Sequence, residues 1–585
     1  MEITKEFDSQ QNRSNLLERI TIGDALFALI VLGAAAFRVY NLGIIPLNDA
    51  EALKALSIWQ FWLPGNLEAA NIGSPAYFSF TAPLTQLIGF SDTTMRLIPA
   101  FFGVGVVILP RFLQHRLGTV GVLISSILLA ISPLNVILSR TVGGDAIALF
   151  AILLFFVAFI RYQETAVSEW LYTMAAAVGL GLASSILFYS GLLTLIIAML
   201  IQRRFGLPLF DHESLLRPEQ EERNKALVIG GLILLLSATM FLWNFVGIGD
   251  AANLIGEWFN SLVNPDSQRT IADPLLAIGR YEPLILVLGI PATIWAIWRS
   301  KPIATTALYW MLTILLLIVI RRGDMGNAAL ITLPSYLLIG LFVQSVLGTH
   351  LRRYAAIVGI GFFVAFGVIA INIGRYVRVA IYDPTDLRYL LIALMALVLI
   401  FMTIYVVSVY EVSAIYQGTI IALLAFYVVV QWGIAFQLAN YHANDPRERW
   451  VLEGTDQGVR YLARLATDVS QQVTGGKDMM QIQSAVDSPA LTWYLRELKS
   501  LQVGEALPNE AVHDVIITSA NVEFPLEDSF TGTKFRFKRS GYTEIAPNPE
   551  TAVSDLLRWW FFHETPSQMM VEDLIVWVRT ELIEQ

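Results

Sequence analysis

The chain has 585 residues, of which 55% are hydrophobic and only 15% are charged. This composition is far more apolar than that of an ordinary soluble domain, so it excludes a soluble globular protein and indicates an integral membrane protein. The net charge of -9 arises mainly from the chain ends and the C-terminal tail, and nucleic-acid binding is not suggested. Because the chain has no cysteine, disulfides and thiolate metal sites are excluded.

Apolar stretches long enough to cross a bilayer recur between Asp24 and Gln437. Counting stretches of the necessary length predicts about 13 helical spans. Their expected starts lie near Thr21, Arg96, Gly118, Gly143, Trp170, Phe188, Ala226, Pro283, Ile303, Asn327, Tyr354, Leu387 and Tyr416. The stretch from Trp170 to Ile201 fits either one strongly tilted helix or two short helices that break near residues 189–191.

The distribution of Lys and Arg favours the two-helix choice with a cytoplasmic N-terminus, because the inner loops then carry most of the basic residues. The polar segment 1–19 is followed by no cleavage pattern, so the first span is expected to remain as an anchor. The large loop 40–95 then lies outside. After an odd number of spans, the C-terminal tail also lies outside the cell membrane.

The composition changes sharply near residue 445, which predicts a transmembrane domain over 1–445 and a small extracytoplasmic α/β domain over 446–585. The patterns in this domain predict helices at Thr455–Val469 and Pro489–Leu501, and strands at Val512–Thr518 and Lys534–Lys538. The aromatic run 559–562 fits either the bilayer interface or packing between the domains.

Two carboxylates, Asp49 and Glu51, stand in the first outer loop. The segment 50–63 can form an amphipathic helix along the membrane surface, with apolar side chains broadly on one side at Leu53, Leu56, Trp59, Trp62 and Leu63. The carboxylates would lie at its N-terminal end, where the helix dipole favours negative charge and a carboxylate can cap the backbone. Alternatively, one acid deprotonates an acceptor hydroxyl while the other positions the acceptor or a metal ion.

Three stretches in about the first quarter to third of the chain carry a family pattern. They are Arg38 to Gly43 with Pro46-Leu47 and Asp49-Ala50-Glu51-Ala52; Ser74 to Phe78 with Ala82-Pro83, Gly89 to Ser91 and Arg96 to Gly103; and Ser139-Arg140 with Asp145-Ala146. In order and spacing they resemble the membrane glycosyltransferases of the GT-C class. The resemblance is strongest to the dolichyl-phosphate-mannose protein mannosyltransferases (family 39) and the aminoarabinose transferase relatives.

This resemblance implies a GT-C-like membrane glycosyltransferase that moves a sugar from a polyprenyl-phosphate donor to an extracytoplasmic acceptor, with inversion at the anomeric carbon. The acceptor would be a protein hydroxyl, or a lipid or glycan. A base activates the acceptor, and cations stabilise the departing lipid phosphate. Asp49 is the first candidate for the base and Glu51 the second. Substrate contacts are expected from Tyr77, Arg96, Arg140 and Asp145.

Three further charges have two readings each. Asp145 begins a span, where a charge is costly unless it is paired or hydrated, so it is either a substrate ligand or a partner of Arg140 or helix cap. Arg322 and Arg375 stand in outer loops, against the inside bias of the other basic residues. A guanidinium matches the oxygens of a lipid phosphate, although snorkelling to lipid headgroups explains each position equally well.

No cofactor is indicated with certainty. The six histidines show no metal-ligand spacing, so a divalent cation is left open through carboxylates alone. The glycine motifs lack the spacing of nucleotide loops, which disfavours a nucleotide-sugar donor. The alternatives are a transporter or flippase of lipid-linked sugars, and a catalytically inactive GT-C relative. A transporter would use charges at the bilayer midplane and internal repeats, whereas most ionisable residues here lie at span ends.

Overall fold

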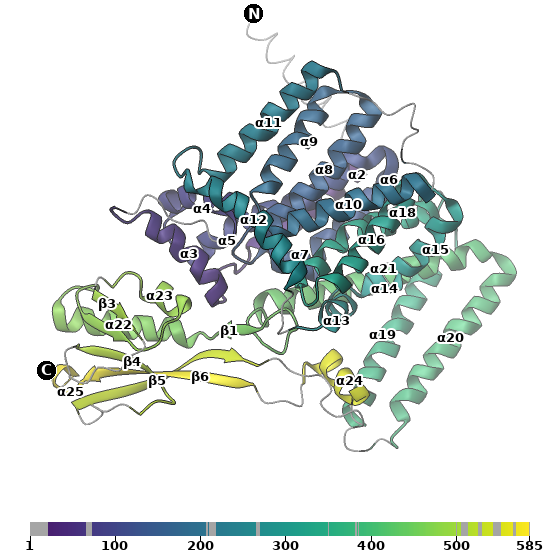
Figure 1. Cartoon of the computed structure of the whole chain (residues 1–585). Helices are drawn as coiled ribbons and strands as arrows, with labels where there is room; N and C mark the ends of the chain where they lie inside the picture. The colour runs from purple at the N-terminus through teal and green to yellow at the C-terminus, as the bar shows by residue number, and fades with distance from the viewer. Residues whose placement is uncertain are drawn as a thin grey trace, which may run out of the picture.

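The computed structural model describes residues 21–65, 73–205, 209, 218–264, 269–348, 350–380, 383, 385–498, 500–504, 513–523, 529–541, 552–564 and 569–583. Within them, a helical N-terminal region is followed by a C-terminal region built on a six-stranded sheet. Figure 1 shows the helices as a bundle with the sheet running along one end of it, and α3 at the junction between the two.

The N-terminal region consists of helices with one 3-10 turn. In chain order they are α2 (Ile22–Val39), α3 (Asp49–Phe61), α4 (Pro75–Ile88), α5 (Asp92–Ile108), η1 (Leu109–Leu113), α6 (Gln114–Ile131), α7 (Pro133–Ser139), α8 (Asp145–Thr165), α9 (Ser168–Leu182), α10 (Ile186–Phe205), α11 (Gln220–Ala238), α12 (Val246–Val263), α13 (Ala272–Tyr281), α14 (Pro283–Val287), α15 (Gly289–Arg299), α16 (Pro302–Ile320), α17 (Met325–Leu330), α18 (Thr332–Leu347), α19 (Ala355–Val379), α20 (Arg388–Tyr410) and α21 (Val412–Asn440).

Among the described residues, nine helical segments are long and apolar enough to cross a membrane. The number becomes ten if α13 and α14–α15, which are bent by 89° relative to each other, form one broken span. The predicted number of about 13 is therefore not confirmed. Two expected spans fall short for physical reasons, because α9 has only 15 residues and the first turns of α11 carry several charges. The polytopic helical class itself is correct.

The ambiguous stretch from Trp170 forms two helices, α9 and α10, as the charge bias favoured. The break lies at residues 183–185, earlier than the expected 189–191. Gly191 instead lies inside α10, where an added Cβ would come within 2.2 Å of the Ile152 side chain on α8. This glycine therefore permits close helix packing rather than a break.

The bundle is organised around α8, whose side chains are buried on most sides by α5, α9 and α10. Small residues let neighbouring helices approach. At the crossing of α6 and α18, Gly121 and Gly340 face each other, and a Cβ on Gly340 would lie 2.6 Å from the Gly121 carbonyl oxygen. Such close backbone contacts stabilise helix pairs in lipid, where the hydrophobic effect between helices is weak.

The C-terminal region has a mixed sheet of order β1-β5-β6-β4-β2-β3. Its elements are β1 (Glu453–Thr455), α22 (Gly458–Thr474), β2 (Gln481–Ser484), α23 (Pro489–Leu495), β3 (Ser500–Val503), β4 (Val515–Ser519), β5 (Phe530–Ser540), α24 (Ala552–Phe562), β6 (Met570–Arg579) and α25 (Thr580–Ile583). Strand β2 pairs parallel with β3 and β4, whereas β6 pairs antiparallel with β4 and β5, and β5 antiparallel with β1.

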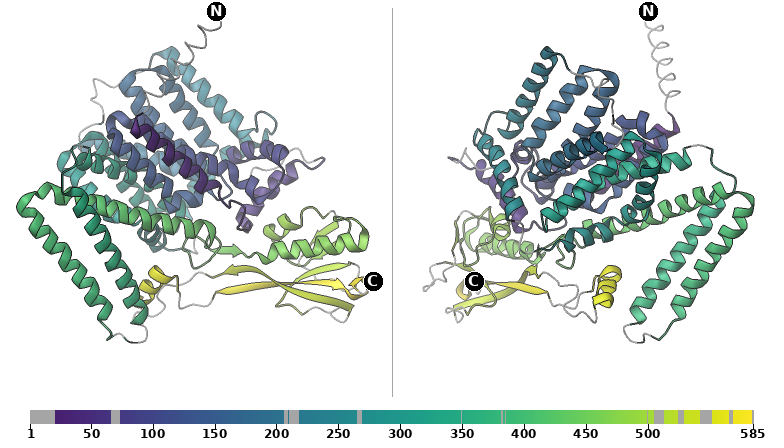
Figure 2. Two further views of the ribbon diagram at one scale, coloured as in Figure 1. Left: turned by 180° about the vertical axis from the view of Figure 1, so that it is seen from behind. Right: turned by 45° about the vertical axis from the view of Figure 1, so that its right-hand side comes forward.

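The expected α/β character of this region is correct, but the bounds differ. The helix predicted over Thr455–Val469 is α22, since Thr455 ends β1; the strand predicted at Val512–Thr518 is β4, with Val512 outside the described residues; and the strand predicted at Lys534–Lys538 is part of the longer β5. The predicted helix from Pro489 to Leu501 ends at Leu495, because Ser500 and Leu501 pair with β2 as part of β3. The aromatic run belongs to α24, which lies beside the end of α19 (Figure 2). Trp559 in this run is fully buried, and its Nε1 donates to the Arg447 carbonyl at 2.8 Å, so packing explains it.

The two regions share one hydrophobic core, which joins α3 and α4 to α22 and α23. At its edge Asp92, the first residue of α5, accepts from Trp493 Nε1 at 2.8 Å and Tyr494 Oη at 2.6 Å, and pairs with Arg460 at 2.5 Å. Burial, together with the charge of Asp92, raises the pKa of Tyr494. Asp92 thus fixes α22 and α23 of the C-terminal region against the start of α5.

Replacing Asp92 tests this anchor. Asp92→Ala is expected to lower the free energy of unfolding by about 3 kcal/mol, because the half-buried Arg460 and the donors of Trp493 and Tyr494 lose a charged acceptor. Thermal unfolding and tryptic release of the C-terminal region, both in detergent, measure the effect. The control Asp573→Ala removes an ion pair whose lysine, Lys534, is exposed to solvent, and is expected to cost under about 1 kcal/mol. Equal losses for the two variants would contradict the assignment.

Candidate active site

Helix α3 begins at Asp49, and its first turn is closed by a capping box. The Asn48 side chain accepts from the Glu51 N–H at 2.9 Å, and the Glu51 carboxylate accepts from the Asn48 N–H at 3.4 Å. Both carboxylates therefore lie at the N-terminal end of a helix, as expected, where the backbone N–H groups and the dipole favour negative charge.

The same helix does not lie on a surface with one apolar side. It packs between α4 and α23, so residues around much of its circumference are buried, including Ala52, Ala55 and Ile58. Leu53 and Leu63, expected on the apolar side, are 41% and 42% exposed. The expectation failed because the C-terminal region covers a side of α3 that the local pattern alone assigned to solvent.

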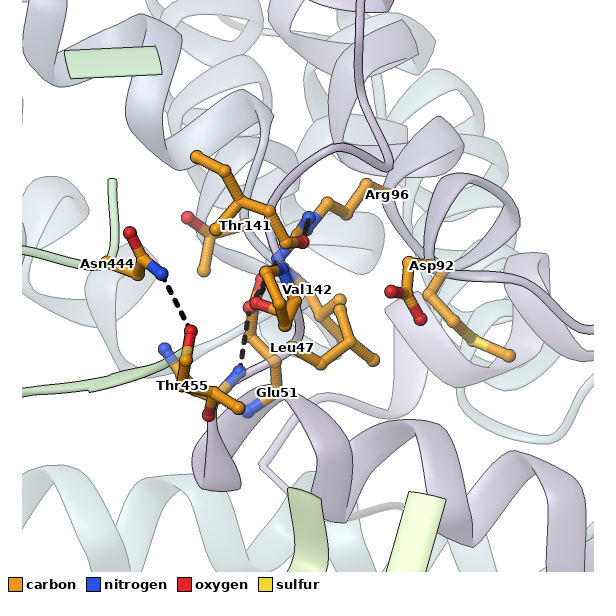
Figure 3. Close-up of polar contacts among 12 residues, drawn as sticks. Leu47, Glu51, Asp92, Arg96, Thr141, Val142, Asn444 and Thr455 are labelled. Atoms are coloured by element: carbon orange, nitrogen blue, oxygen red, sulfur yellow. Dashed lines mark hydrogen bonds and ion pairs between the residues drawn. The ribbon is translucent and has the colours of Figure 1, made fainter. Parts of the chain in front are cut away.

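Glu51 is buried, with 5% exposure, and forms an ion pair with Arg96 of α5. Arg96 Nη2 lies 2.6 Å from Glu51 Oε2, and Arg96 Nε lies 3.1 Å from Oε1. Glu51 Oε1 also accepts from the Val142 N–H at 2.9 Å. Figure 3 shows Glu51, Arg96 and Val142 close together, and the contact with Val142 ties α3 to the α7–α8 connection.

Arg96 also holds the backbone of the first loop. Its Nη1 donates to the carbonyls of Leu42 at 3.1 Å and Ile45 at 2.7 Å. Nearly all of its donors are therefore used inside the protein. In this structure Arg96 therefore stabilises the wall of the cavity described below. Its predicted role as a substrate ligand stays a prediction.

Asp49 has a different environment, which the C-terminal region supplies. Its Oδ1 accepts from Ser488 Oγ at 2.7 Å and from the Ala490 N–H at 2.9 Å, which caps the start of α23. Its Oδ2 pairs with Lys538 of β5. The side chain is 28% exposed. A carboxylate has about four lone-pair positions, so these three contacts leave Oδ2 with capacity for one more donor.

Lys538 is nearly buried, with 8% exposure, and also binds Glu453 Oε1 of β1 at 3.0 Å. Burial by itself lowers the pKa of an ammonium group. Here the hydrogen bonds and charges of Asp49 and Glu453 outweigh burial and raise the pKa of Lys538. The lysine is therefore held as a cation between two carboxylates.

Asp49 and Glu51 line a cavity of about 700 Å³ at the junction of the two regions. The bundle contributes the loop after α2, the end of α7 and the end of α21, and the C-terminal region contributes the ends of β1 and β5. The charged lining residues are Asp49, Glu51, Arg96, Arg140, Arg269 and Glu453. A cavity of this size with both signs of charge suits a polar ligand.

Arg140 lines this cavity but directs its donors to the backbone. Its Nη1 donates to the carbonyls of Phe37, Arg38 and Tyr40, and its Nη2 to those of Asn41 and Ala439. It closes the C-terminal end of α2 rather than pairing with Asp145, the partner considered from the sequence. Tyr77 lines neither this cavity nor its neighbour, and its Oη donates to the Met95 carbonyl at 2.7 Å.

A second cavity of about 380 Å³ adjoins the first, and it contains Asp145 and Arg322. Thr141, Arg269 and Trp450 line both cavities, so they form the shared wall. Arg269 Nη2 donates to the Trp450 carbonyl at 2.8 Å within this wall. The structure thus brings six of the eight predicted site residues to two adjoining cavities, which leaves out Tyr77 and Arg375.

The second cavity has its own ion pair. Arg321 Nη2 lies 2.6 Å from Asp324 Oδ2, and Arg321 Nη1 donates to Ser190 Oγ at 2.6 Å. Burial and the nearby Asp145 charge raise the pKa of Asp324, against the opposing effect of Arg321. Arg322, the next residue, is exposed. Of the two adjacent arginines, Arg322 is thus the one available to a ligand.

Arg375 lies on an exposed face of α19 and lines neither cavity.

The sequence analysis missed Arg269, Lys538 and Ser488. Arg269 had a usable signal, because it is a basic residue in an expected outer loop, as Arg322 is. The other two lie more than 400 residues from Asp49 and share no local pattern with it. Among the described residues, no group of three or more His, Asp or Glu side chains gathers as a metal site.

Comparisons with solved structures place this architecture in a known class. The crystal structure of ArnT from Cupriavidus metallidurans bound to undecaprenyl phosphate is 13% identical, covers 87% of this chain and 97% of that chain, and gives a TM-score of 0.56. Its apo form is 14% identical, with coverage of 88% and 98% and a TM-score of 0.54. The Archaeoglobus fulgidus oligosaccharyltransferase in the apo form is 11% identical, with coverage of 89% and 74% and a TM-score of 0.48. The chain has the fold of the GT-C membrane glycosyltransferases.

A family match agrees with this class. Residues 55–245 match the family described as dolichyl-phosphate-mannose-protein mannosyltransferase. No curated protein sequence matches the chain. The resemblance inferred from the sequence is therefore confirmed, both in the family domain and in the fold.

The buried pair can be tested by a double-mutant cycle. Arg96→Met is expected to destabilise the protein by about 3–5 kcal/mol, because it leaves the Glu51 carboxylate buried without a counter-charge. Adding Glu51→Gln removes that charge, so the double variant is expected to lose less than the sum of the single losses. Denaturant unfolding in detergent measures each variant. Strictly additive losses would show that the two side chains are not coupled.

Proposed function

We propose that the protein is an integral membrane glycosyltransferase that moves a sugar from a polyprenyl-phosphate donor to an acceptor hydroxyl outside the cytoplasm. The observation that carries the proposal is Asp49, a carboxylate with unused hydrogen-bonding capacity on the wall of a cavity of about 700 Å³. Next to it is a smaller cavity with Asp145 and Arg322. The GT-C fold and the family match supply the reaction class.

Asp49 is the proposed base, in preference to Glu51. A base must accept a hydrogen bond from the acceptor hydroxyl before it removes the proton. Both Glu51 oxygens are bound to Arg96, and Oε1 also accepts from Val142. Asp49 Oδ2 can still accept one hydrogen bond, because Lys538 is its sole partner among the described residues. The acceptor oxygen would then attack the anomeric carbon from the side opposite the phosphate, which inverts it.

Arg322 is the proposed cation for the lipid phosphate. A guanidinium forms charge-assisted hydrogen bonds to phosphate oxygens, and these stabilise the negative charge that develops on the leaving group. Arg140 and Arg96 use their donors on backbone carbonyls and on Glu51, which suits them to shaping the cavity. Asp145 in the same cavity is proposed to bind substrate hydroxyl groups. For Arg375 we favour contact with lipid headgroups, because it lines neither cavity.

A lipid-linked donor is supported by an apolar groove of about 650 Å³ between α2, α6 and α21. The groove reaches Tyr40 and Phe436, whereas Asn41 and Leu438, close by in sequence, line the first cavity. An isoprenoid chain in the groove would bring its phosphate toward the polar site. The similar ArnT structure contains bound undecaprenyl phosphate, which agrees with this donor class.

We further propose that the N-terminus is cytoplasmic and the C-terminal domain extracytoplasmic.

One observation favours the rival function, transport of lipid-linked sugars. The α13–α15 segment is a candidate broken span, and transporters use broken helices with charges at the break. Glu282 lies at this break, but it accepts from Ser132 Oγ at 2.5 Å, the Leu134 N–H at 3.1 Å and Gln431 Nε2 at 2.8 Å. It lines none of the three cavities described above, so we assign it to holding the bend.

The proposed base is tested with Asp49→Asn in proteoliposomes supplied with undecaprenyl-phosphate-linked tritiated mannose and a membrane extract as acceptor. The kcat of sugar transfer is expected to fall about 10²- to 10⁴-fold, the usual contribution of a general base. Asp386→Asn, which changes a carboxylate that pairs with the exposed Arg388 and lines neither polar cavity, is the control and should transfer at the wild-type rate. Transfer that survives replacement of both Asp49 and Glu51 would exclude these bases, and movement of the lipid without transfer would favour the rival function.

The proposed phosphate contact is tested with Arg322→Met. Loss of this charge-assisted contact is expected to raise the KM for the donor about tenfold, because it forms in the bound donor, and to lower kcat, because the charge that develops on the leaving group loses stabilisation. Arg388→Met removes another exposed arginine, on α20, and should leave the KM unchanged. The same assay measures both variants across a range of donor concentrations. An unchanged KM for Arg322→Met would reject Arg322 as a phosphate ligand.

A further inference from the structure

Lys538 is an unusual residue to find buried in the C-terminal domain. Lysine is almost never fully buried unless it is paired, because its ammonium group loses hydration. Lys538 is 8% exposed, and Phe537 beside it in sequence is fully buried. In a regular strand these neighbours would face opposite sides of the sheet. The register of β5 against β6 shifts between Arg536 and Lys538, and such bulges redirect side chains.

The side chain of Lys538 reaches across the junction to the proposed base. It pairs with Asp49 Oδ2 on α3, in the bundle, and with Glu453 Oε1 on β1. Both of these carboxylates line the cavity of about 700 Å³. Glu572 lies opposite Lys538 on β6. Burial raises the pKa of Glu572, and the nearby charge of Lys538 opposes this effect. Lys538 is therefore the cation that separates carboxylates which would otherwise repel one another.

We propose that Lys538 is a positioning residue for Asp49, and that the C-terminal domain is in this way part of the active site. The inference rests on the proposed function, since it assigns a role to the base of that reaction. Three groups of the C-terminal domain hold the Asp49 carboxylate: Lys538, Ser488 Oγ and the Ala490 N–H. Within the part of the chain that the structure describes, Lys538 alone contacts Oδ2, the oxygen that can accept one more hydrogen bond. It fixes the orientation of that oxygen toward the acceptor.

A catalytic group displaced by about 1 Å can lose on the order of a hundredfold in rate. Without Lys538, the Asp49 carboxylate can rotate away from Glu453, and its Oδ2 no longer has a fixed direction. Lys538→Met, which keeps the length of the side chain, is therefore expected to lower kcat by about 10- to 100-fold. The KM for the donor should stay unchanged, because the proposed phosphate contact, Arg322, lies in the other cavity.

Lys534 provides a matched control on the same strand. It forms a comparable ion pair with Asp573 at 2.8 Å, but its side chain is 61% exposed and Asp573 lines neither polar cavity. Lys534→Met should therefore transfer sugar at the wild-type rate. Thermal unfolding of both variants, as full-length protein in detergent, shows how much each loses in stability. Lys538→Gln serves as a second variant if Lys538→Met does not fold.

The decisive measurement is the kcat of transfer from undecaprenyl-phosphate-linked tritiated mannose in the wild type, Lys538→Met, Asp49→Asn and the double variant. If Lys538 acts through Asp49, Lys538→Met has no further effect on the residual rate of Asp49→Asn. A merely structural role would lower the rate in both backgrounds by the same factor, and that result would overturn the proposal. Lys538→Arg, which keeps the charge, is expected to recover part of the rate.

The failure of this inference differs from the failure of the proposed function. If the wild type transfers no sugar from this donor and only moves or binds the lipid, the proposed function is wrong, and the assignment of Lys538 falls with it. If the wild type transfers sugar and Lys538→Met matches Lys534→Met in kcat, the proposed function stands and the positioning role is wrong.

Discussion

The end of the bundle next to the C-terminal region depends on the buried ion pair between Arg96 and Glu51. Charges removed from water are costly, so such a pair persists only when hydrogen bonds satisfy its remaining atoms. Here the carbonyls of Leu42 and Ile45 and the N–H of Val142 complete it. The pair therefore joins the first loop, α3, α5 and the α7–α8 connection, and these segments form much of the cavity wall.

The geometry of a helix explains why two carboxylates so close in sequence have separate partners. Residues two positions apart on an α-helix point about 200° apart around its axis. Glu51 therefore faces the bundle and Asp49 faces the C-terminal domain. Two arginines of the family pattern donate hydrogen bonds to backbone carbonyls. Arg38 donates to those of Leu129 and Ala130, and Arg140 to carbonyls at the end of α2. Much of the recognisable pattern is thus architectural.

The sequence was sufficient for the features that local patterns carry. Apolar stretches indicated the membrane helices, and the motifs around Asp49, Arg96 and Asp145 indicated the class and five of the residues that line the two cavities. Long-range contacts were beyond it. The pairing of Asp49 with Lys538 joins residues 489 positions apart, and no periodicity connects them. The contact between α3 and α23 was missed for the same reason. The number of spans was overestimated because short or charged helices, such as α9 and α11, were counted as spans.

The junction between the two regions has a consequence for how such proteins can be divided and recombined. Its contacts are reciprocal: Asp49 caps α23 of the C-terminal domain, while Asp92 holds Trp493, Tyr494 and Arg460. A chimera that joined this bundle to the C-terminal domain of a distant relative would leave these acids facing unmatched side chains. The two regions are therefore expected to be inherited and exchanged as one unit, although the fold draws a clear border between helices and sheet.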